Sequence, residues 1–244
     1  MSTQTVRNRL KAYQLKARRP YTGTILLRRH RNNRRNWTRV HRRWALRQWN
    51  NVLFSDESRF CLQHGDGRRR VWRRRGERFA NCCVAERDRF GGGSVMVWGG
   101  ICGGTRTRLL VLNGNLTGIR YRDEILRPVV LPFLRRHGVG AILQQDNAPA
   151  HTSRVSRTFL QQNNVQVLDW PSKSPDLSPI EHVWDVLGRR VRERQNQPSN
   201  LQELAQALIA EWNNISPRII RRFTSSMRRR CNAVYFANGG HTRY

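Results

Sequence analysis

Two short apolar runs in this chain each lead into a carboxylate. The run Val52–Phe54 is followed by Asp56, and the run Ile142–Leu143 is followed, after two glutamines, by Asp146. Short apolar runs of this kind predict buried strands, and a helical pattern begins near Pro149. We therefore expect Asp56 to end one strand and Asp146 to lie exposed at the carboxyl end of another. Open α/β sheets place their active sites at such strand ends.

The rest of the pattern predicts further strands and helices. Residues 59–63 and 70–73 alternate between apolar and polar positions and are predicted to pair as antiparallel neighbours around a turn at 64–67. Other strands are predicted at 94–101, 108–112 and 165–169. Helices are predicted at 1–20, 25–49, 120–137 and 149–162, from Ser178 onward, and twice within 200–230. This order indicates an α/β fold with a mixed sheet flanked by helices, in one compact domain from about Asn51 onward.

The charge balance changes this picture by indicating a polyanionic partner. Lys and Arg number 46 against 16 Asp and Glu, which gives a formal net charge of +30, and no acid precedes Asp56. Such an excess favours nucleic acid as the partner. Only three of the basic residues are Lys. The preference for Arg reflects either selection for bidentate phosphate contacts or a bias in the coding sequence.

Cysteine spacing and the length of the apolar runs argue against zinc-binding, disulfide-rich, membrane and secreted proteins. The five Cys form no C-x-x-C pair, which favours neither a zinc site nor a disulfide framework and is typical of a reduced, intracellular protein. No apolar run approaches the roughly 18 residues of a membrane span, and the N-terminus has no apolar signal core. We therefore expect neither a membrane protein nor a secreted one.

Three carboxylates on separate predicted elements suggest a divalent metal site. Asp56 and Asp146 follow strands, and Glu181 opens the helix that begins near Ser178. Phosphodiester chemistry places charge on the attacking and the leaving oxygen, and two divalent ions about 3.5–4 Å apart stabilise both. Magnesium prefers oxygen ligands and keeps several bound waters, so two or three carboxylates on rigid elements suffice to bind it.

Each of these carboxylates also has a purely structural explanation. Ser178 and Glu181 have the spacing of a capping box, so Glu181 could accept the first amides of its own helix. Asp146 could cap the helix near Pro149, and Asp56 could be a solvated turn residue. Spacing alone leaves these alternatives open. His151 and His182 lie near the acids in the sequence, and such histidines more often orient metal ligands than bind the metal. Asp176 and Asp185 are alternative candidates for the third metal ligand.

The chain contains the blocks Phe54-Ser-Asp-Glu-Ser58, Gln145-Asp-Asn-Ala-Pro-Ala-His151, and Trp170-Pro followed by Ser174-Pro-Asp-Leu-Ser-Pro-Ile-Glu-His-Val-Trp184. In this order they closely resemble the three catalytic blocks of the Tc/mariner superfamily of transposases, in its Tc-like branch. The gap of 34 residues between Asp146 and Glu181 is the gap of that branch. The resemblance runs from about Thr3 to the C-terminal helices.

The resemblance implies a ribonuclease-H-like fold and a DNA transposase of the cut-and-paste type. Asp56 would bridge two Mg²⁺ ions, Asp146 and Glu181 would each hold one, and Mn²⁺ would substitute. Water would be the first nucleophile at the element's terminal inverted repeats, and the freed 3′-hydroxyl would then attack double-stranded target DNA at TA steps. A homodimer that works in the nucleus is expected.

The resemblance also assigns segments to DNA binding and to dimer contacts. It implies that residues 1–50 are a remnant of a second helix-turn-helix unit with a basic connector helix, and that residues 51–244 are the catalytic domain with C-terminal helices. The expected DNA-binding residues are Arg7, Arg9, Lys11, Lys16, Arg18 and Arg19. The expected dimer clamp contains Arg70, Val71, Trp72, Arg73, Gly76 and Glu77, without the proline that family members often have there.

Other functions compete with this interpretation. Because family members begin with two helix-turn-helix units, the chain is expected to be an N-terminally shortened copy. It could therefore be a catalytically impaired, transposon-derived DNA-binding protein. A nuclease that acts on RNA hybrids would share the fold but would not require the clamp.

Overall fold

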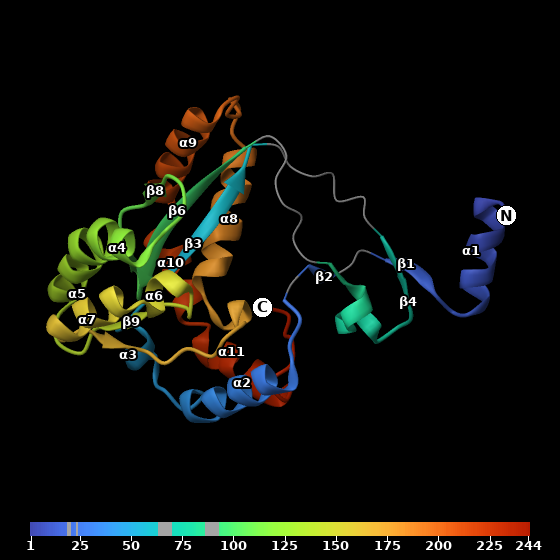
Figure 1. The fold of residues 1–244 in the computed structure, drawn as a ribbon, viewed down its shortest axis with the longest axis horizontal. Coiled ribbons are helices and arrows are strands. Elements are labelled where there is room, and N and C mark those ends of the chain that lie inside the picture. Colours follow the sequence, from blue (N-terminus) through green and yellow to red (C-terminus); the bar gives the residue numbers. More distant parts are fainter. Residues whose placement is uncertain (19–20, 23, 63–69, 86–92) are drawn as a thin grey trace.

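The computed structural model describes residues 1–18, 21–22, 24–62, 70–85 and 93–244 (Figure 1). Within these residues the central feature is a six-stranded sheet in the order β10-β9-β3-β6, with β7 and β8 both paired to β6. Its strands are β3 (Val52–Cys61), β6 (Ser94–Cys102), β7 (Thr105–Arg106), β8 (Leu110–Leu112), β9 (Ile142–Gln144) and β10 (Gln166–Val167). β9 runs parallel to β3 and β10, whereas β6 runs antiparallel to its partners. The mixed sheet predicted from the sequence is confirmed.

Strand β3 lies in the middle of this sheet and carries Asp56 within it. Its pairing with β6 continues past Asp56, which lies opposite Gly99, as far as Cys61. The prediction that Asp56 ends a strand is therefore wrong, and residues 59–61 belong to β3 rather than to a separate strand. The apolar run stops at Phe54, but backbone hydrogen bonds extend the strand without apolar side chains.

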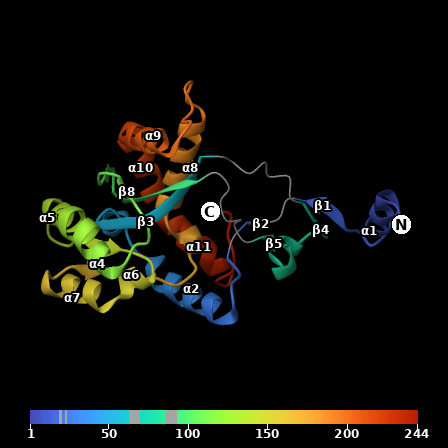
Figure 2. The same cartoon turned by 45° about the horizontal axis from the view of Figure 1, so that its top comes forward.

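Helices cover both faces of the sheet (Figures 1 and 2). One face packs against α4 (Gly118–Arg120), η3 (Tyr121–Val130), α5 (Leu131–His137), α6 (Pro149–Thr152) and α7 (Arg154–Gln162). The other packs against α8 (Ile180–Arg192), α9 (Leu201–Asn214), α10 (Pro217–Thr224), α11 (Met227–Phe236), α2 (Arg28–His41) and α3 (Leu46–Trp49). Alternation along β3 explains the two layers, because Leu53 joins the first core cluster while Val52 and Phe54 join the second.

Three of the predicted helical segments are divided in the structure. The segment 25–49 gives α2 and α3, with Trp44 between them packed on both His41 and Trp49. The segment 149–162 is interrupted at Ser153, whose hydroxyl accepts from the Ser156 N–H and caps α7. The segment 200–230, predicted to form two helices, contains α9, α10 and the beginning of α11. In the first two cases aromatic packing at Trp44 and the cap at Ser153 override a continuous helical pattern, and in the third Pro217 begins a new helix, α10.

The predicted helix at 120–137 begins slightly earlier and contains a long π-helical stretch. Helix α4 begins at Gly118, η3 is π-helical and contains Pro128, and α5 ends at Gly138, where φ is 102°. A proline inside a helix removes one backbone donor, and local π geometry is one way in which a helix accommodates such a change. Gly138 ends the helix as predicted, because a positive φ is unfavourable for other residues.

The first residues form an arm that lies away from the central sheet (Figure 1). It consists of α1 (Thr3–Ala12), which has no buried residue, and of β1 (Lys16–Arg18), which pairs antiparallel with β4 (Val71–Arg73). The short strands β2 (Tyr21–Thr22) and β5 (Val84–Ala85) pair in parallel. Segment 70–73 therefore pairs with β1 and not with 59–63 as predicted, and the turn predicted at 64–67 lies outside the described residues.

The predicted helix 1–20 is correspondingly shorter. Helix α1 ends at Ala12, and Gln14 adopts a φ of 61° before β1 begins. Helix α2, in contrast, packs into the main core through Trp37. None of the helices in the described ranges is long and apolar enough to cross a bilayer.

Candidate active site

Asp56 projects from β3 toward the face of the sheet that α8 covers. One oxygen, Oδ2, accepts a hydrogen bond of 3.2 Å from the indole N–H of Trp184 on α8. Burial raises the pKa of Asp56 well above its usual value, and the negative charges of Glu181, Glu57 and Asp146 raise it further. The charges of three other carboxylates thus act on Asp56.

Trp184 reaches Asp56 because the neighbouring strand has no side chain at Gly99. A Cβ at Gly99 would lie 3.0 Å from the Trp184 ring and 3.1 Å from the Trp212 ring. The two indoles stack with centroids 5.2 Å apart. The glycine opposite Asp56 therefore leaves the space in which the tryptophan that binds Asp56 packs.

Asp146 follows β9 by two residues and its side chain is 54% exposed, as predicted for a carboxylate at a strand's carboxyl end. Its Oδ1 accepts from the Ala148 N–H at 2.8 Å and from His151 Nδ1 at 2.7 Å. Desolvation acts to raise the pKa of Asp146, but these two hydrogen bonds outweigh it and lower the pKa below its usual value. The alternative that Asp146 caps the helix near Pro149 is wrong, because the N-cap of α6 is Ala148 and no side chain of the described residues caps that helix. Asp146 binds the N–H of Ala148 instead, and its Oδ2 has no hydrogen bond to the described residues.

His151, on α6, links Asp146 to Glu57. Its Nε2 lies 3.2 Å from Glu57 Oε1, and its ring packs on Tyr121 with centroids 4.4 Å apart. Burial acts to lower the pKa of His151, but the hydrogen bonds to the two carboxylates raise it to about 10. The ring is therefore an imidazolium at neutral pH and donates from both nitrogens. Glu57 and Asp56 point to opposite faces of β3, so His151 connects the site to the face covered by α6.

Glu181 lies in the first turn of α8, and its charge is among those that raise the pKa of Asp56. The residue at the helix N-cap is Pro179, with no side-chain capping bond. The hydroxyl of Ser178 is buried without a hydrogen-bond partner among the described residues. The predicted capping box between Ser178 and Glu181 is therefore not formed.

The two rival acids are placed differently. Asp176 is buried and forms a bidentate ion pair with Arg34, at 2.6 and 2.7 Å, so its charge is already neutralised. Asp185 is exposed, four residues beyond Glu181 on α8. His182 accepts a hydrogen bond of 2.6 Å from Arg230. The interpretation of Asp176 as a metal ligand is therefore wrong, and His182 interacts with an arginine instead of with the carboxylates.

The donor set suits a hard divalent cation. Carboxylate oxygens are the ligands that Mg²⁺ and Mn²⁺ prefer. Burial and the charges of the neighbouring acids raise the pKa of Asp56, and a bound cation relieves repulsion of this kind. Among the described residues, however, no three His, Cys, Asp or Glu side chains stand close enough together to hold an ion as they are. In this arrangement the imidazolium of His151 binds Asp146 and Glu57.

The segments expected to bind DNA and to form the clamp lie in the arm, away from β3 and α8, the elements that carry Asp56 and Glu181 (Figure 1). Arg7, Arg9 and Lys11 lie on α1, and Lys16 and Arg18 on β1, whereas Arg19 is outside the described residues. The clamp residues Arg70, Val71, Trp72 and Arg73 lie at β4, followed by Gly76 and Glu77, and Lys16 lies opposite Arg73. Glu77 closes a turn by accepting from the Arg74 N–H at 2.7 Å. The structure thus joins the two predicted segments in one small antiparallel pair.

Sequence reasoning missed several residues that support the site. In the sequence Glu57 resembles a turn residue. Both Asp56 and Glu57 lie within β3, and alternation along a strand places neighbouring side chains on opposite faces of the sheet. Trp184 lies three residues after Glu181, the spacing of one helical turn. Arg34 and Arg230 gave no local signal, because the groups that they bind on α8 and just before it are 48 to 142 residues away in the chain.

Comparisons with known proteins agree with this geometry. Residues 51–205 match the family described as DDE superfamily endonuclease. The chain is 37% identical over 246 residues to the Tc1 transposase of Caenorhabditis elegans, covering all of this chain and 88% of that protein. It is 30% identical over 197 residues to the Tc3 transposase of the same organism, covering 80% of this chain and 59% of that protein.

Solved structures of the Mos1 mariner transposase share the fold. The strand transfer complex of Mos1 matches with a TM-score of 0.72 at 20% identity, covering all of this chain and 72% of that one. The Mos1 catalytic domain matches with a TM-score of 0.66 at 16% identity, covering 91% and 100%. The expectation of a ribonuclease-H-like fold is confirmed. The chain belongs to the DDE superfamily endonucleases and, among them, to the Tc/mariner superfamily of cut-and-paste DNA transposases.

Proposed function

We propose that this chain cuts DNA at transposon ends and joins the freed ends to a target, with Asp56, Asp146 and Glu181 as ligands of divalent metal ions. What supports this proposal is that the three acids come from β3, the end of β9 and the start of α8, and that the charges of Glu181 and Asp146 act on Asp56. The matching relatives are transposases, so the reaction class is that of the family.

The protein's own side chains prepare the ligands for this role. Trp184 orients Asp56, and His151 orients Asp146. The ions, Mg²⁺ or Mn²⁺, would polarise the scissile phosphate and help to deprotonate the attacking water. Structures of Mos1 with Mg and with Mn support this choice of ion. We propose two ions, with Asp56 as the shared ligand.

The partners follow from the same proposal. Structures of Mos1 include a complex with a left transposon end and a strand transfer complex. By analogy, the substrates of this chain are double-stranded terminal inverted repeats and a TA target, bound by a homodimer in the nucleus. The net charge of +30 supports a DNA partner directly.

The test is cleavage of a labelled duplex that carries the element's own terminus, by the full chain with Mg²⁺ or Mn²⁺. Asp146→Asn and Glu181→Gln are expected to lower the rate on the order of a thousandfold, because several kcal/mol of charge stabilisation are removed. The matched control is Asp185→Asn, an exposed acid four residues beyond Glu181 on the same helix, which should cut like the wild type.

The outcomes separate the competing functions. Cutting that survives Asp146→Asn and Glu181→Gln would disprove the catalytic role of these acids. A wild-type chain that binds the duplex but cuts neither this terminus nor other DNA would favour the impaired DNA-binding protein. Cutting that requires an RNA strand would favour the nuclease that acts on hybrids.

A further inference from the structure

Two arginines outside the site are as deeply buried as the apolar core. The side chains of Arg34, on α2, and Arg230, on α11, are each only 1% exposed. A buried guanidinium loses its hydration, so it is stable only where protein groups satisfy its donors. Their partners therefore show which parts of the chain they fix.

Arg34 uses all five of its N–H groups. The two terminal nitrogens donate to the two carboxylate oxygens of Asp176 at 2.6 and 2.7 Å. The remaining donors reach the carbonyl oxygens of Lys173 at 3.1 Å, Gly239 at 2.9 Å and Gly240 at 3.0 Å. One side chain thus joins three parts of the chain: α2, the segment before α8 (residues 173–179) and the C-terminal tail (residues 239–244).

Arg230 binds the same segment from another direction. Its Nη1 donates to the carbonyl oxygens of Asp176 at 2.7 Å and Ser178 at 3.4 Å. Its Nη2 donates to His182 Nδ1 at 2.6 Å, and its guanidinium lies 4.8 Å from the ring centroid of Tyr244. The groups that it binds lie on both sides of Glu181 in the sequence.

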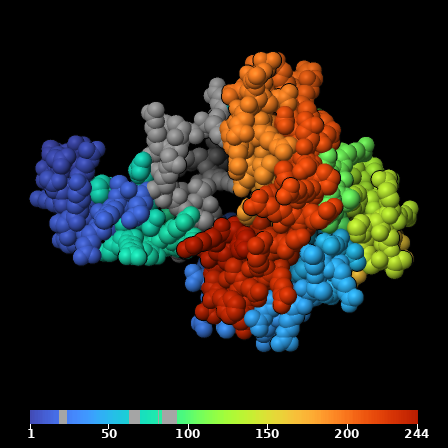
Figure 3. Space-filling view, turned by 180° about the vertical axis from the view of Figure 1, so that it is seen from behind, coloured from blue at the N-terminus to red at the C-terminus, as the bar shows by residue number. Residues whose placement is uncertain are grey.

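The C-terminal tail completes this support. The hydroxyl of Thr242 donates to Asp176 Oδ2 at 2.9 Å. Gly239 lies so close to α2 that a Cβ on it would be 1.9 Å from the Arg31 carbonyl oxygen. Figure 3 shows the C-terminal residues, in red, beside the blue helix α2. The tail therefore has a fixed place from which it contacts Arg34 and Asp176.

The segment before α8 has little regular structure of its own. It contains one 3₁₀ turn, Pro175–Leu177, and Lys173 adopts a φ of 57°. It leads directly into the helix that carries both Glu181 and Trp184, the residue that binds Asp56. A displacement of this segment would move both groups relative to Asp56.

We propose that Arg34 and Arg230 are positioning residues, which fix the start of α8 and thereby set Glu181 relative to Asp56. The proposal rests on the proposed function of Glu181 as a metal ligand. The hydrogen bonds of the two arginines reach the segment before α8 and His182, and the charge of Glu181 also acts on Arg230. The arginines act through Asp176, Ser178 and His182, in the way that outer groups orient metal ligands in other proteins.

The test substitutes each arginine by lysine in the full chain. Arg34→Lys and Arg230→Lys keep the positive charge but lack the planar fork that binds several acceptors at once. Mn²⁺ binding is measured by electron paramagnetic resonance without DNA, and the Mn²⁺ concentration for half-maximal cleavage is measured with DNA. The dissociation constant and the half-maximal concentration are both expected to rise on the order of tenfold, the usual effect of removing a group that orients a ligand, while DNA affinity stays unchanged.

The matched control is Arg194→Lys. Arg194 follows the far end of α8 and also pairs with a carboxylate at 2.6 Å, that of Glu211, but it is only half-buried. It should leave both Mn²⁺ values unchanged. Where the buried lysine variants do not fold, Thr242→Val removes a single hydrogen bond from Asp176, and it should weaken Mn²⁺ binding about threefold.

The outcomes distinguish this inference from the function on which it rests. If folded lysine variants, or Thr242→Val in their place, bind Mn²⁺ as the wild type does, the positioning role is disproved. If Glu181→Gln itself leaves Mn²⁺ binding unchanged, the proposed function fails instead. Hydrogen exchange provides a second readout, because the amides of Leu177 and Ser178 should exchange faster in the lysine variants while those of β3 do not.

Discussion

His41, the last residue of α2, shows how burial sets the charge of a single side chain. Its ring stacks on Trp37 with centroids 4.0 Å apart, and its Nδ1 lies 2.8 Å from the Trp37 carbonyl oxygen. Burial lowers the pKa of His41 below 6.5, although the hydrogen bond to Trp37 and the charge of Asp169 act in the opposite direction. The folded state therefore favours the neutral ring.

This gives the protein a dependence of stability on pH that a substitution at His41 can reveal. The unfolded chain takes up a proton at His41 near pH 6.5, whereas the folded chain does so only at lower pH, so stability falls as the pH drops from about 7.5 to 5.5. His41→Phe keeps an aromatic ring and removes this titration. The melting temperature of the variant should therefore fall less than that of the wild type over that interval. An equal fall in both proteins would contradict the assignment.

At the level of residues, the sequence predicted the acids but not what orients them. Asp56, Asp146 and Glu181 stand in motifs that can be recognised along the chain. Their partners come from distant elements, and a hydrogen bond across the fold leaves no periodic pattern in the sequence. Asp176 resembles a rival ligand in the sequence for this reason, since its partner Arg34 precedes it by 142 residues.

At the level of elements, the pair β3 and β6 builds one wall of the site. Gly99 of β6 lies opposite Asp56, and the rings of Trp184 and Trp212 fill the space above it. This packing couples a strand to two helices, α8 and α9. A change of one methyl group on β6 should therefore reach the site through α8.

Gly99→Ala tests this coupling. Its Cβ would lie 3.0–3.1 Å from both indole rings, and overpacking of this kind costs about 1–3 kcal/mol of stability. Because Trp184 would be displaced from Asp56, metal-dependent cleavage should fall on the order of tenfold. Thermal melting and cleavage rates measure the two effects.

Gly104→Ala, at the turn before β7, is the control for this substitution. The atoms nearest to a Cβ there belong to the flexible end of Arg221, so stability and cleavage should stay close to those of the wild type. Equal behaviour of the two alanine variants would show that Trp184 does not depend on the space at Gly99.

The elements themselves were predictable where the pattern was local. Alternation and apolar runs located β6, β9 and the helix that ends at Gly138. Strand partners were harder, because pairing is a long-range choice. The segment 70–73 has the pattern of a neighbour of β3, yet it pairs with β1. Helix interruptions were missed for a related reason, since the packing of Trp44 and the cap at Ser153 depend on the finished fold.

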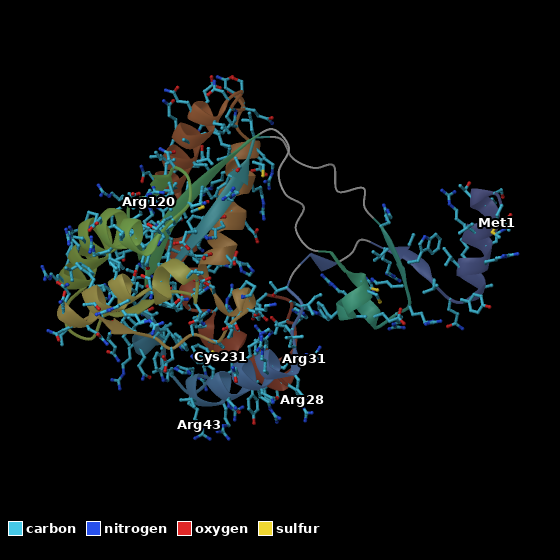
Figure 4. All side chains as sticks on the ribbon, viewed as in Figure 1. Met1, Arg28, Arg31, Arg43, Arg120 and Cys231 are labelled. Atoms are coloured by element: carbon cyan, nitrogen blue, oxygen red, sulfur yellow. The ribbon has the colours of Figure 1, made fainter. Side chains whose placement is uncertain are left out.

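At the level of the whole molecule, positive charge is spread over several surfaces. Arg28, Arg31 and Arg43 are exposed on the outer side of α2 and just after it, and the arm ends at Met1 (Figure 4). Helix α1 buries no side chain, so its basic residues are available for phosphate contacts. We expect this arm to contribute to DNA affinity without reading base sequence.

Arg7→Gln combined with Lys11→Gln should weaken binding of any duplex to a similar extent. The slope of log affinity against log salt concentration should fall by about one unit for each phosphate that the variant no longer neutralises. Arg136→Gln, an exposed position on α5, at the opposite end of the molecule from α1, is the control and should keep the wild-type slope (Figure 1). Weaker binding to one sequence alone would indicate base recognition by α1 instead.

The fixed place of the C-terminal tail has a consequence for how copies of this gene decay. Gly239 and Gly240 supply two acceptors of Arg34, and Thr242 supplies a donor to Asp176. A stop codon or frameshift just before Gly239 would leave every catalytic block intact in the reading frame and would still remove the support of the segment before α8. Inspection of the three acidic motifs would classify such a copy as intact. A test of whether a copy can still encode a working enzyme should therefore also check that the codons from Gly239 to the C-terminus are intact.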